Sequence, residues 1–166
     1  MESKNFPENK KAVIFLDIDG VLNCQSSKSR CAGFIGIDNN KVKVLRKIVE
    51  QTSAKIVLVS SWKSDWEPAR KELQHEHGNY LDKKLKREGL FILDKTKDGG
   101  GKRGTGIIEW LRDHAGVTSW VVLDDEIFPD YEECGILNHL VKTDFYLDNG
   151  GLQEEHIESA VKMLGG

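Results

Sequence analysis

Three short apolar runs constrain the fold of this chain more than any other feature. They are Ala12–Leu16, Ile56–Val59 and Trp120–Leu123. Short continuous runs of branched and aromatic residues are typical of strands that are buried on both faces, as in a parallel sheet. A weaker run at 90–93 and a broken one at 137–141 predict two more strands, the second of them at a sheet edge.

Helical patterns lie between these runs. Asn39 or Asn40 can cap a helix whose apolar residues, from Val42 to Val49, follow helical spacing. Further helices are expected over residues 64–77, 104–115 and 153–164. The alternation of strand and helix predicts an α/β fold with three layers, in which a Rossmann-like parallel sheet is flanked by helices.

The length of 166 residues suits one domain with a core of its own. Residues 1–11 are polar and predict an N-terminal arm, so the expected domain is 12–166. Apolar residues make up 39% and charged residues 31% of the chain, which is the mix of a soluble globular protein. The formal net charge of -3 gives no general sign of nucleic-acid binding, although it leaves local basic patches open.

The apolar runs and the cysteines also bear on location. No run approaches the ~20 residues that a membrane span requires, and the first residues lack the apolar core of a signal peptide. The three cysteines, Cys24, Cys31 and Cys134, form no C-x-x-C pair, which argues against a disulfide scaffold or a zinc ribbon. We therefore expect a cytoplasmic protein without membrane contact, whose oligomeric state the sequence does not specify.

Each of the three buried runs leads into polar residues. These are Asp17 and Asp19 after the first run, Ser60 and Ser61 after the second, and Asp124 and Asp125 after the third. Because the carboxyl ends of parallel strands lie along one edge of the sheet, these side chains are expected to share one crevice. Four carboxylates placed together repel one another, and Mg²⁺, which prefers oxygen ligands, is the usual remedy.

Such a crevice has the parts for phosphoryl transfer. One carboxylate can attack phosphorus and form an aspartyl-phosphate, and a second carboxylate two residues later can act first as an acid and then as a base. Hydroxyls, backbone N–H groups and a nearby Lys or Arg can hold the phosphoryl oxygens.

Phe15–Leu22 (FLDIDGVL), Val57–Ser61 (VLVSS) and Val121–Asp125 (VVLDD) resemble the first, second and fourth motifs of the haloacid dehalogenase (HAD) superfamily of phosphatases. More narrowly, SSWK at 60–63, RGTGI at 103–107 and the tail at 141–152 are similar to the HAD domains associated with Swiss Army Knife RNA repair proteins. The resemblance runs from about residue 12 to residue 164 and implies a HAD-like fold.

The resemblance implies a role for each residue of the crevice. Asp17 would be the nucleophile and a metal ligand, and Asp19 would be the acid/base, with its backbone carbonyl also on the metal. Ser60 would bind the phosphoryl group, and Asp124 and Asp125 would ligate Mg²⁺. Further substrate contacts are expected from Gly20, Asn23, Ser61 and Lys63.

The third motif of the superfamily requires a Lys or Arg before a helix, and both Lys102 and Arg103 meet this requirement. The segment 23–40 is too short for a helical cap domain, so we expect no large cap. Capless members often act on large substrates. Together with the RNA-repair resemblance, this makes end-phosphates of RNA or DNA candidate substrates, beside other exposed phosphate esters.

Four other features have plainer interpretations. The basic cluster at 83–87 is typical of a solvated face, with contact to a polyanion as the alternative. The glycines at 99–101 lack P-loop spacing and predict a mobile loop. His75 and His77 are more typical of an exposed helix end than of a metal pair. Trp62 is expected in the core, with stacking on a base or sugar as the alternative.

Other functions compete with that of a phosphatase. A phosphotransferase or mutase shares the aspartyl-phosphate step. A receiver domain also holds an aspartyl-phosphate, but its acceptor follows the third strand and has no acid/base two residues later, unlike Asp17 with Asp19. A HAD domain that serves only as a phosphate-binding module would be expected to lack one of these two residues, and both are present.

Overall fold

Five parallel strands form the central sheet of the computed structural model, which describes residues 11–97 and 101–166. The strands are β1 (Lys11–Leu16), β4 (Lys55–Leu58), β5 (Ile92–Lys95), β6 (Val117–Asp124) and β7 (Leu140–Lys142). Their spatial order is β5-β4-β1-β6-β7, so the three strong apolar runs form the three central strands. Of the predicted arm, only Lys11 is described, and it begins β1; the glycines 99 and 100 also lie outside the described residues.

The three central strands end at the same level. Leu16 of β1 pairs with Leu58 of β4 on one side and with Leu123 of β6 on the other. The ladders continue past the strands, because Asp17 donates its N–H to the Leu123 carbonyl (3.0 Å) and Val59 donates to the Leu16 carbonyl (2.9 Å). The residues that follow β1, β4 and β6 are therefore brought side by side.

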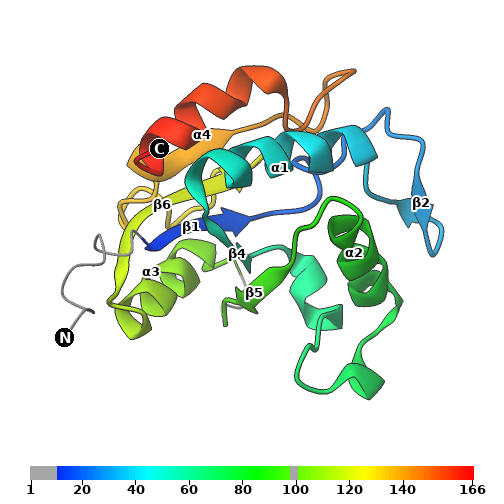
Figure 1. Ribbon diagram of the computed structural model, residues 1–166, viewed down its shortest axis with the longest axis horizontal. Coiled ribbons are helices and arrows are strands. Elements are labelled where there is room, and N and C mark those ends of the chain that lie inside the picture. Colours follow the sequence, from blue (N-terminus) through cyan, green and yellow to red (C-terminus); the bar gives the residue numbers. More distant parts are fainter. Residues whose placement is uncertain (1–10, 98–100) are drawn as a thin grey trace.

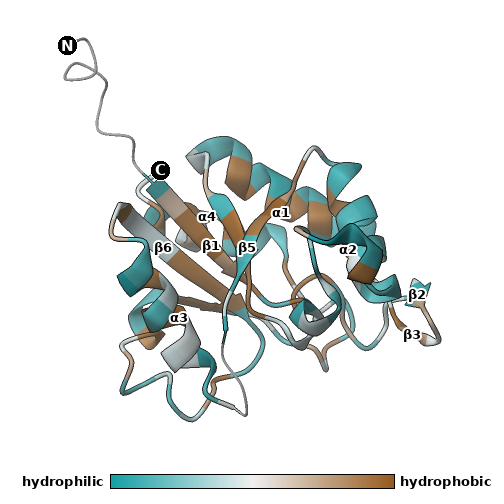
Figure 2. Ribbon diagram, turned by 90° about the horizontal axis from the view of Figure 1, so that it is seen from below, coloured by the Kyte–Doolittle hydropathy of each residue, from teal (hydrophilic) through white to brown (hydrophobic). Residues whose placement is uncertain are grey.

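Helices cover both faces of the sheet (Figure 1). α1 (Asn39–Thr52) and α4 (Ile157–Met163) pack on one face, over residues such as Ile14 and Leu16, whereas α3 (Arg103–Asp113) packs on the other, over Val13 and Phe15. Alternate residues of β1 thus belong to two separate apolar clusters. Figure 2 shows the hydrophobic strands between helices whose outer surfaces are hydrophilic, which confirms the predicted three-layer α/β architecture.

The helix predicted over residues 64–77 is wrong. This stretch contains two short 3₁₀ helices, η2 (Ser61–Asp65) and η3 (Lys71–Leu73), and the α-helix comes later as α2 (Glu76–Lys86). Pro68 disfavours helical geometry at Glu67 before it, and the Gln74 side chain accepts the Glu67 N–H instead (2.9 Å). The basic cluster at 83–87 therefore lies at the C-terminal end of α2, where positively charged Lys side chains interact favourably with the helix dipole.

Smaller differences concern the ends of elements. Asp38, one residue before the predicted caps, accepts the Asn40 N–H and caps α1. The broken run at 137–141 splits into the 3₁₀ helix η4 (Leu137–His139) and the edge strand β7. The last predicted helix begins as a 3₁₀ turn, η5 (Glu154–His156), before α4. None of the helices in 11–97 or 101–166 combines the length and hydropathy needed to cross a membrane.

Candidate active site

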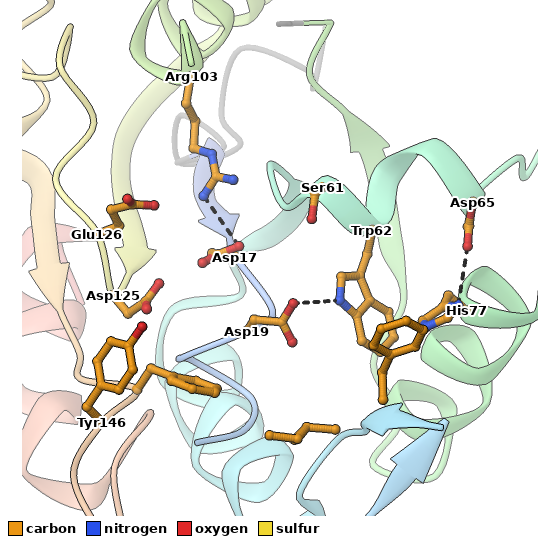
Figure 3. A pocket seen from close by; sticks show the side chains of 13 residues that line it. Asp17, Asp19, Ser61, Trp62, Asp65, His77, Arg103, Asp125, Glu126 and Tyr146 are labelled. Carbon is orange, nitrogen blue, oxygen red and sulfur yellow. Dashed lines mark hydrogen bonds and ion pairs between the residues drawn. The ribbon is translucent and has the colours of Figure 1, made fainter. Parts of the chain in front are cut away.

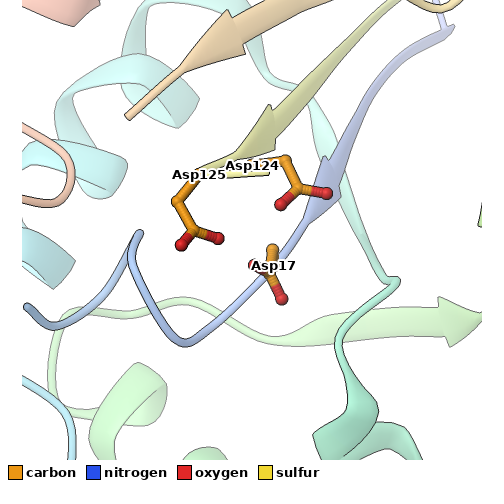
Figure 4. A group of neighbouring side chains, drawn as sticks. All are labelled: Asp17, Asp124 and Asp125. Carbon is orange, nitrogen blue, oxygen red and sulfur yellow. The ribbon is translucent and has the colours of Figure 1, made fainter. Parts of the chain in front are cut away.

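Three carboxylates converge where β1 and β6 end (Figure 4). Asp17 follows β1, Asp124 is the last residue of β6 and Asp125 follows it. One carboxylate oxygen from each lies within 4.8 Å of the others. Asp17 and Asp124 are buried, and Asp125 is half-buried. The register of β1 beside β6 creates this cluster, which could hold a metal ion.

The cluster carries an excess of negative charge. Burial, and then the charge of Asp124, raises the pKa of Asp17 well above its usual range, although Arg103 opposes this. Burial and Asp124 also raise the pKa of Asp125. A divalent cation would stabilise the ionised forms of Asp17 and Asp125, which their surroundings disfavour. Together with Asp124 they offer three hard oxygen donors, so the donor set fits a metal of the Mg²⁺ type.

Arg103, the first residue of α3, supplies positive charge to the same cluster (Figure 3). Its Nη1 lies 2.9 Å from Asp124 Oδ2 and 3.3 Å from Asp17 Oδ1, and its guanidinium lies over the Phe128 ring. Burial lowers the pKa of Arg103, but the two carboxylates raise it by more. Lys102 is exposed and its side chain makes no capping bond to α3. The structure therefore brings Arg103, and not Lys102, to the carboxylates.

Two residues in the loop after β6 fix this arrangement, and sequence reasoning missed both. Asp130 accepts hydrogen bonds from Gly104 N (3.0 Å), Thr105 N (2.8 Å) and Thr105 Oγ1 (2.9 Å), and so caps α3 beside Arg103. Burial raises the pKa of Asp130, but these donors lower it by more. Tyr131 donates its hydroxyl to Asp124 Oδ2 (2.6 Å). No spacing rule links this loop to α3, because their contact exists only in the folded chain.

Asp19 is not one of the three grouped carboxylates, but it lines the same cavity. Its carboxylate accepts the Trp62 indole N–H (3.1 Å, Figure 3) and the Asn23 side-chain N–H (2.9 Å). Asn23 is itself buried, and it also accepts the Gly20 N–H (2.9 Å) and donates to the Gly36 carbonyl (2.9 Å). Asn23 thus braces the turn after β1, and Asp19 is an exposed carboxylate held on both of its oxygens.

The predicted phosphate-binding residues after β4 separate into two groups. Ser61 lines the cavity, whereas Ser60 is buried and its Oγ accepts the Trp62 N–H (3.2 Å), which caps η2. Lys63 is half-buried and donates to Thr96 Oγ1 (3.1 Å). In this arrangement Ser61 is the residue of the three that faces the site.

A cavity of about 660 Å³ opens over these groups. Asp17, Asp19, Asp125 and Arg103 line it on the side of the sheet. Phe34 of β3 and Tyr146 of the loop after β7 line it farther out and are 68% and 76% exposed. Between β1 and α1, the described chain forms only the short hairpin of β2 (Arg30–Cys31) and β3 (Phe34–Ile35), so the site has no large cap on this side.

Comparison with known proteins gives one family. The sequence model of the HAD domain in Swiss Army Knife RNA repair proteins matches residues 13–157, which extend from β1 to the first residue of α4. No curated protein gives a significant match to the chain.

Proposed function

Since the chain belongs to the family of HAD domains in Swiss Army Knife RNA repair proteins, we propose that it is a phosphomonoester hydrolase that works through an aspartyl-phosphate. The observation that carries this proposal is the position of Asp17. It lies at the end of the central strand, in contact with Arg103 and within 4.8 Å of two further carboxylates. A nucleophile for phosphorus needs such a place, where charge on the phosphoryl oxygens can be offset.

Asp17, Asp124 and Asp125 would hold Mg²⁺, and the bound ion would offset the negative charge of the phosphoryl group. Arg103 contributes to the same end. Its charge lowers the pKa of Asp17 against the larger effect of burial, which favours the ionised form of the nucleophile. The donor set supports the assignment of the metal, because its side-chain ligands are all carboxylate oxygens.

The reaction follows from the two carboxylates on one turn. A carboxylate oxygen of Asp17 forms a bond to phosphorus as the ester P–O bond breaks, and Asp19 gives its proton to the leaving oxygen. Asp19, now a carboxylate, then takes a proton from water as that water attacks phosphorus. Inorganic phosphate leaves and Asp17 is regenerated. Asp19 is exposed and lines the cavity, so it is accessible to both the leaving oxygen and water.

For the substrate, we propose the end-phosphate of an RNA or DNA strand. The family supports this, and so does the wide cavity with the exposed rings of Phe34 and Tyr146, because aromatic rings can stack on bases. The basic residues at the end of α2 are a further candidate contact for a polyanion. We also propose that the protein works in the cytoplasm, in keeping with its three unpaired cysteines.

The test is phosphate release from p-nitrophenyl phosphate and from oligonucleotides with a 5′- or a 3′-phosphate, in Mg²⁺ and in chelator. Asp17→Asn is expected to abolish release and keep the far-UV circular dichroism of the wild type. Asp113→Asn, at the exposed end of α3, is the matched control and should keep full activity. Release that survives in Asp17→Asn or in chelator would contradict the mechanism.

The same assay tests the substrate class. If nucleic acid is the substrate, charge reversal at Lys83, Lys84, Lys86 and Arg87 should raise KM for the oligonucleotides and leave p-nitrophenyl phosphate unchanged. Equal changes for both substrates would count against contact between α2 and a nucleic acid.

A further inference from the structure

The indole of Trp62 makes a directed contact with the acid/base of the site. Its Nε1 donates to Asp19 Oδ2 at 3.1 Å, while Asn23 donates to the other oxygen, Oδ1, at 2.9 Å. Figure 3 shows the indole N–H and the Asp19 carboxylate facing each other at the wall of the cavity. An exposed Asp side chain is free to rotate, so two donors on its two oxygens fix an orientation that it would not otherwise keep.

The indole is itself held from three sides. Trp62 is 7% exposed, and its ring lies edge-on to His77 with 4.8 Å between ring centroids. Tyr80, one turn further along α2, lies 6.4 Å from it by the same measure. On the other side, the Trp62 backbone N–H is bonded to Ser60 Oγ at the start of η2. The position of the indole N–H is therefore set by α2 and by the end of β4.

We propose that Trp62 is a positioning residue for Asp19, an assignment that rests on the proposed function. A carboxylate has about four lone-pair sites, so each oxygen can accept one N–H and still give or take a proton. The proton passes from Asp19 to the leaving oxygen, and later from water to Asp19. Trp62 exchanges no proton in either step. Together with Asn23, it holds the carboxylate at the wall of the cavity, where the leaving oxygen and water can reach it.

A comparison of two substrates with different leaving groups distinguishes this positioning role from a purely structural one. An alkoxide, such as the 5′ oxygen of an oligonucleotide, needs a proton to leave, whereas p-nitrophenolate leaves without one. The value of kcat/KM covers all steps up to the departure of the leaving group. Loss of correct positioning should therefore lower kcat/KM for the alkyl ester and leave it nearly unchanged for the aryl ester.

The experiment compares the two esters in Trp62→Phe, which removes the N–H donor and keeps an aromatic ring against His77 and Tyr80. We expect kcat/KM for the 5′-phosphorylated oligonucleotide to fall by about 10-fold, part of the 10²- to 10⁴-fold that general acid catalysis typically supplies. For p-nitrophenyl phosphate the change should stay within about twofold. Asp19→Asn gives the upper limit of the alkyl-selective loss.

Trp66→Phe is the matched control. Trp66 is also buried and also donates its indole N–H to a carboxylate, that of Asp82 (2.9 Å), but this bond joins η2 to α2 away from Asp17. Trp66→Phe should change the two esters by the same factor. If Trp62→Phe fails to fold by circular dichroism, His77→Ala takes its place, since it frees the indole edge without removing the N–H. It should also lower kcat/KM selectively for the oligonucleotide, but only by about threefold, because the indole N–H is still present.

The outcomes separate the two proposals. Equal losses for both esters in Trp62→Phe, or no loss in either, overturn the positioning role while the phosphatase stands. A wild type that hydrolyses neither ester overturns the proposed function, and this assignment with it. Selective loss in Asp19→Asn without selective loss in the folded Trp62 or His77 variant shows that Asp19 needs no indole to hold it.

Discussion

Asp125 rests against the backbone of Gly20, and a methyl group on Gly20 would lie 2.3 Å from Asp125 Cγ. Gly20 also has a φ of +88°, which side-chain-bearing residues adopt only with strain. The glycine of the D-x-D-G sequence therefore serves the neighbouring strand as well as its own turn. It leaves the space that the carboxyl group of Asp125 occupies beside Asp17.

Gly20→Ala should displace Asp125 and weaken both the fold and the site. We expect a loss of about 1–3 kcal/mol in the free energy of unfolding, measured with urea, and a loss of metal-dependent phosphate release. Gly89→Ala is the control, because Gly89 also has a positive φ (+72°) but a Cβ there meets nothing within 4 Å. It should lose stability and keep activity. Full activity in Gly20→Ala would contradict the role given to this contact.

Of the two candidates, Lys102 and Arg103, only Arg103 should supply positive charge to the site. Arg103→Met is expected to lower kcat by about 100-fold or more, the usual effect of removing a group that stabilises developing charge. Lys102→Met should stay within about twofold, because the Lys102 side chain is exposed at the start of α3. Comparable losses in the two variants would show that Lys102 moves to the phosphate during turnover.

Metal binding should be visible without any substrate. Mg²⁺ at about 100 times its dissociation constant would stabilise the fold by about 2.7 kcal/mol, so thermal unfolding should shift upward relative to chelator. Asp125→Asn should reduce this shift, because it removes one of the three ligands, and Asp113→Asn should keep it. An equal shift in Asp125→Asn would place the ion elsewhere.

The ionised carboxylate of Asp130 should make the stability of the fold depend on pH. Its pKa in the folded protein is below the ordinary value of 3.8, so the stability that it contributes is present above that pH and is lost as pH falls through the native value. Asp130→Asn should cost about 1–2 kcal/mol in urea unfolding at pH 7, as loss of a helix cap does, and the difference should shrink below pH 4. It should also lower kcat, because Arg103 begins the helix that Asp130 caps.

Asp82→Asn provides the comparison for this prediction. The pKa of Asp82 is also lowered: burial raises it, but the donors of Gln74, Lys71 and Trp66 lower it by more. The variant should show the same pH signature in urea unfolding, with kcat unchanged. A loss of kcat in Asp82→Asn as large as that in Asp130→Asn would mean that stability alone accounts for both.

The central strands of the sheet could be predicted from the sequence because each corresponds to a continuous run of apolar residues. Ala12–Leu16, Ile56–Val59 and Trp120–Leu123 form neighbouring strands, and three of the four carboxylates that follow two of them meet as expected. Helical spacing was a weaker guide between β4 and β5. There Pro68 and the side chain of Gln74 break a stretch that composition alone allows to be helical, and the helix forms on Leu81 and Leu85 instead.

The candidate site could likewise be predicted only in part from the sequence. The proposed nucleophile and metal ligands lie next to strand ends, so their meeting follows from parallel pairing alone. Other contacts depend on loops that approach only in three dimensions. Asp130 meets α3, Tyr131 meets Asp124, and Trp62 turns its edge to Asp19, and none of these pairs is marked by a motif or a fixed spacing.

The position of β1 between β4 and β6 has a consequence for protein synthesis. Asp17 leaves the ribosome before Arg103 and Asp124, so these two residues can join it only after β6 has been made. A nascent chain that ends before β6 thus carries the proposed nucleophile without Asp124 beside it. Under the proposed function, Asp17 would become reactive only when the sheet is complete, and in an unfinished chain it would be an ordinary aspartate.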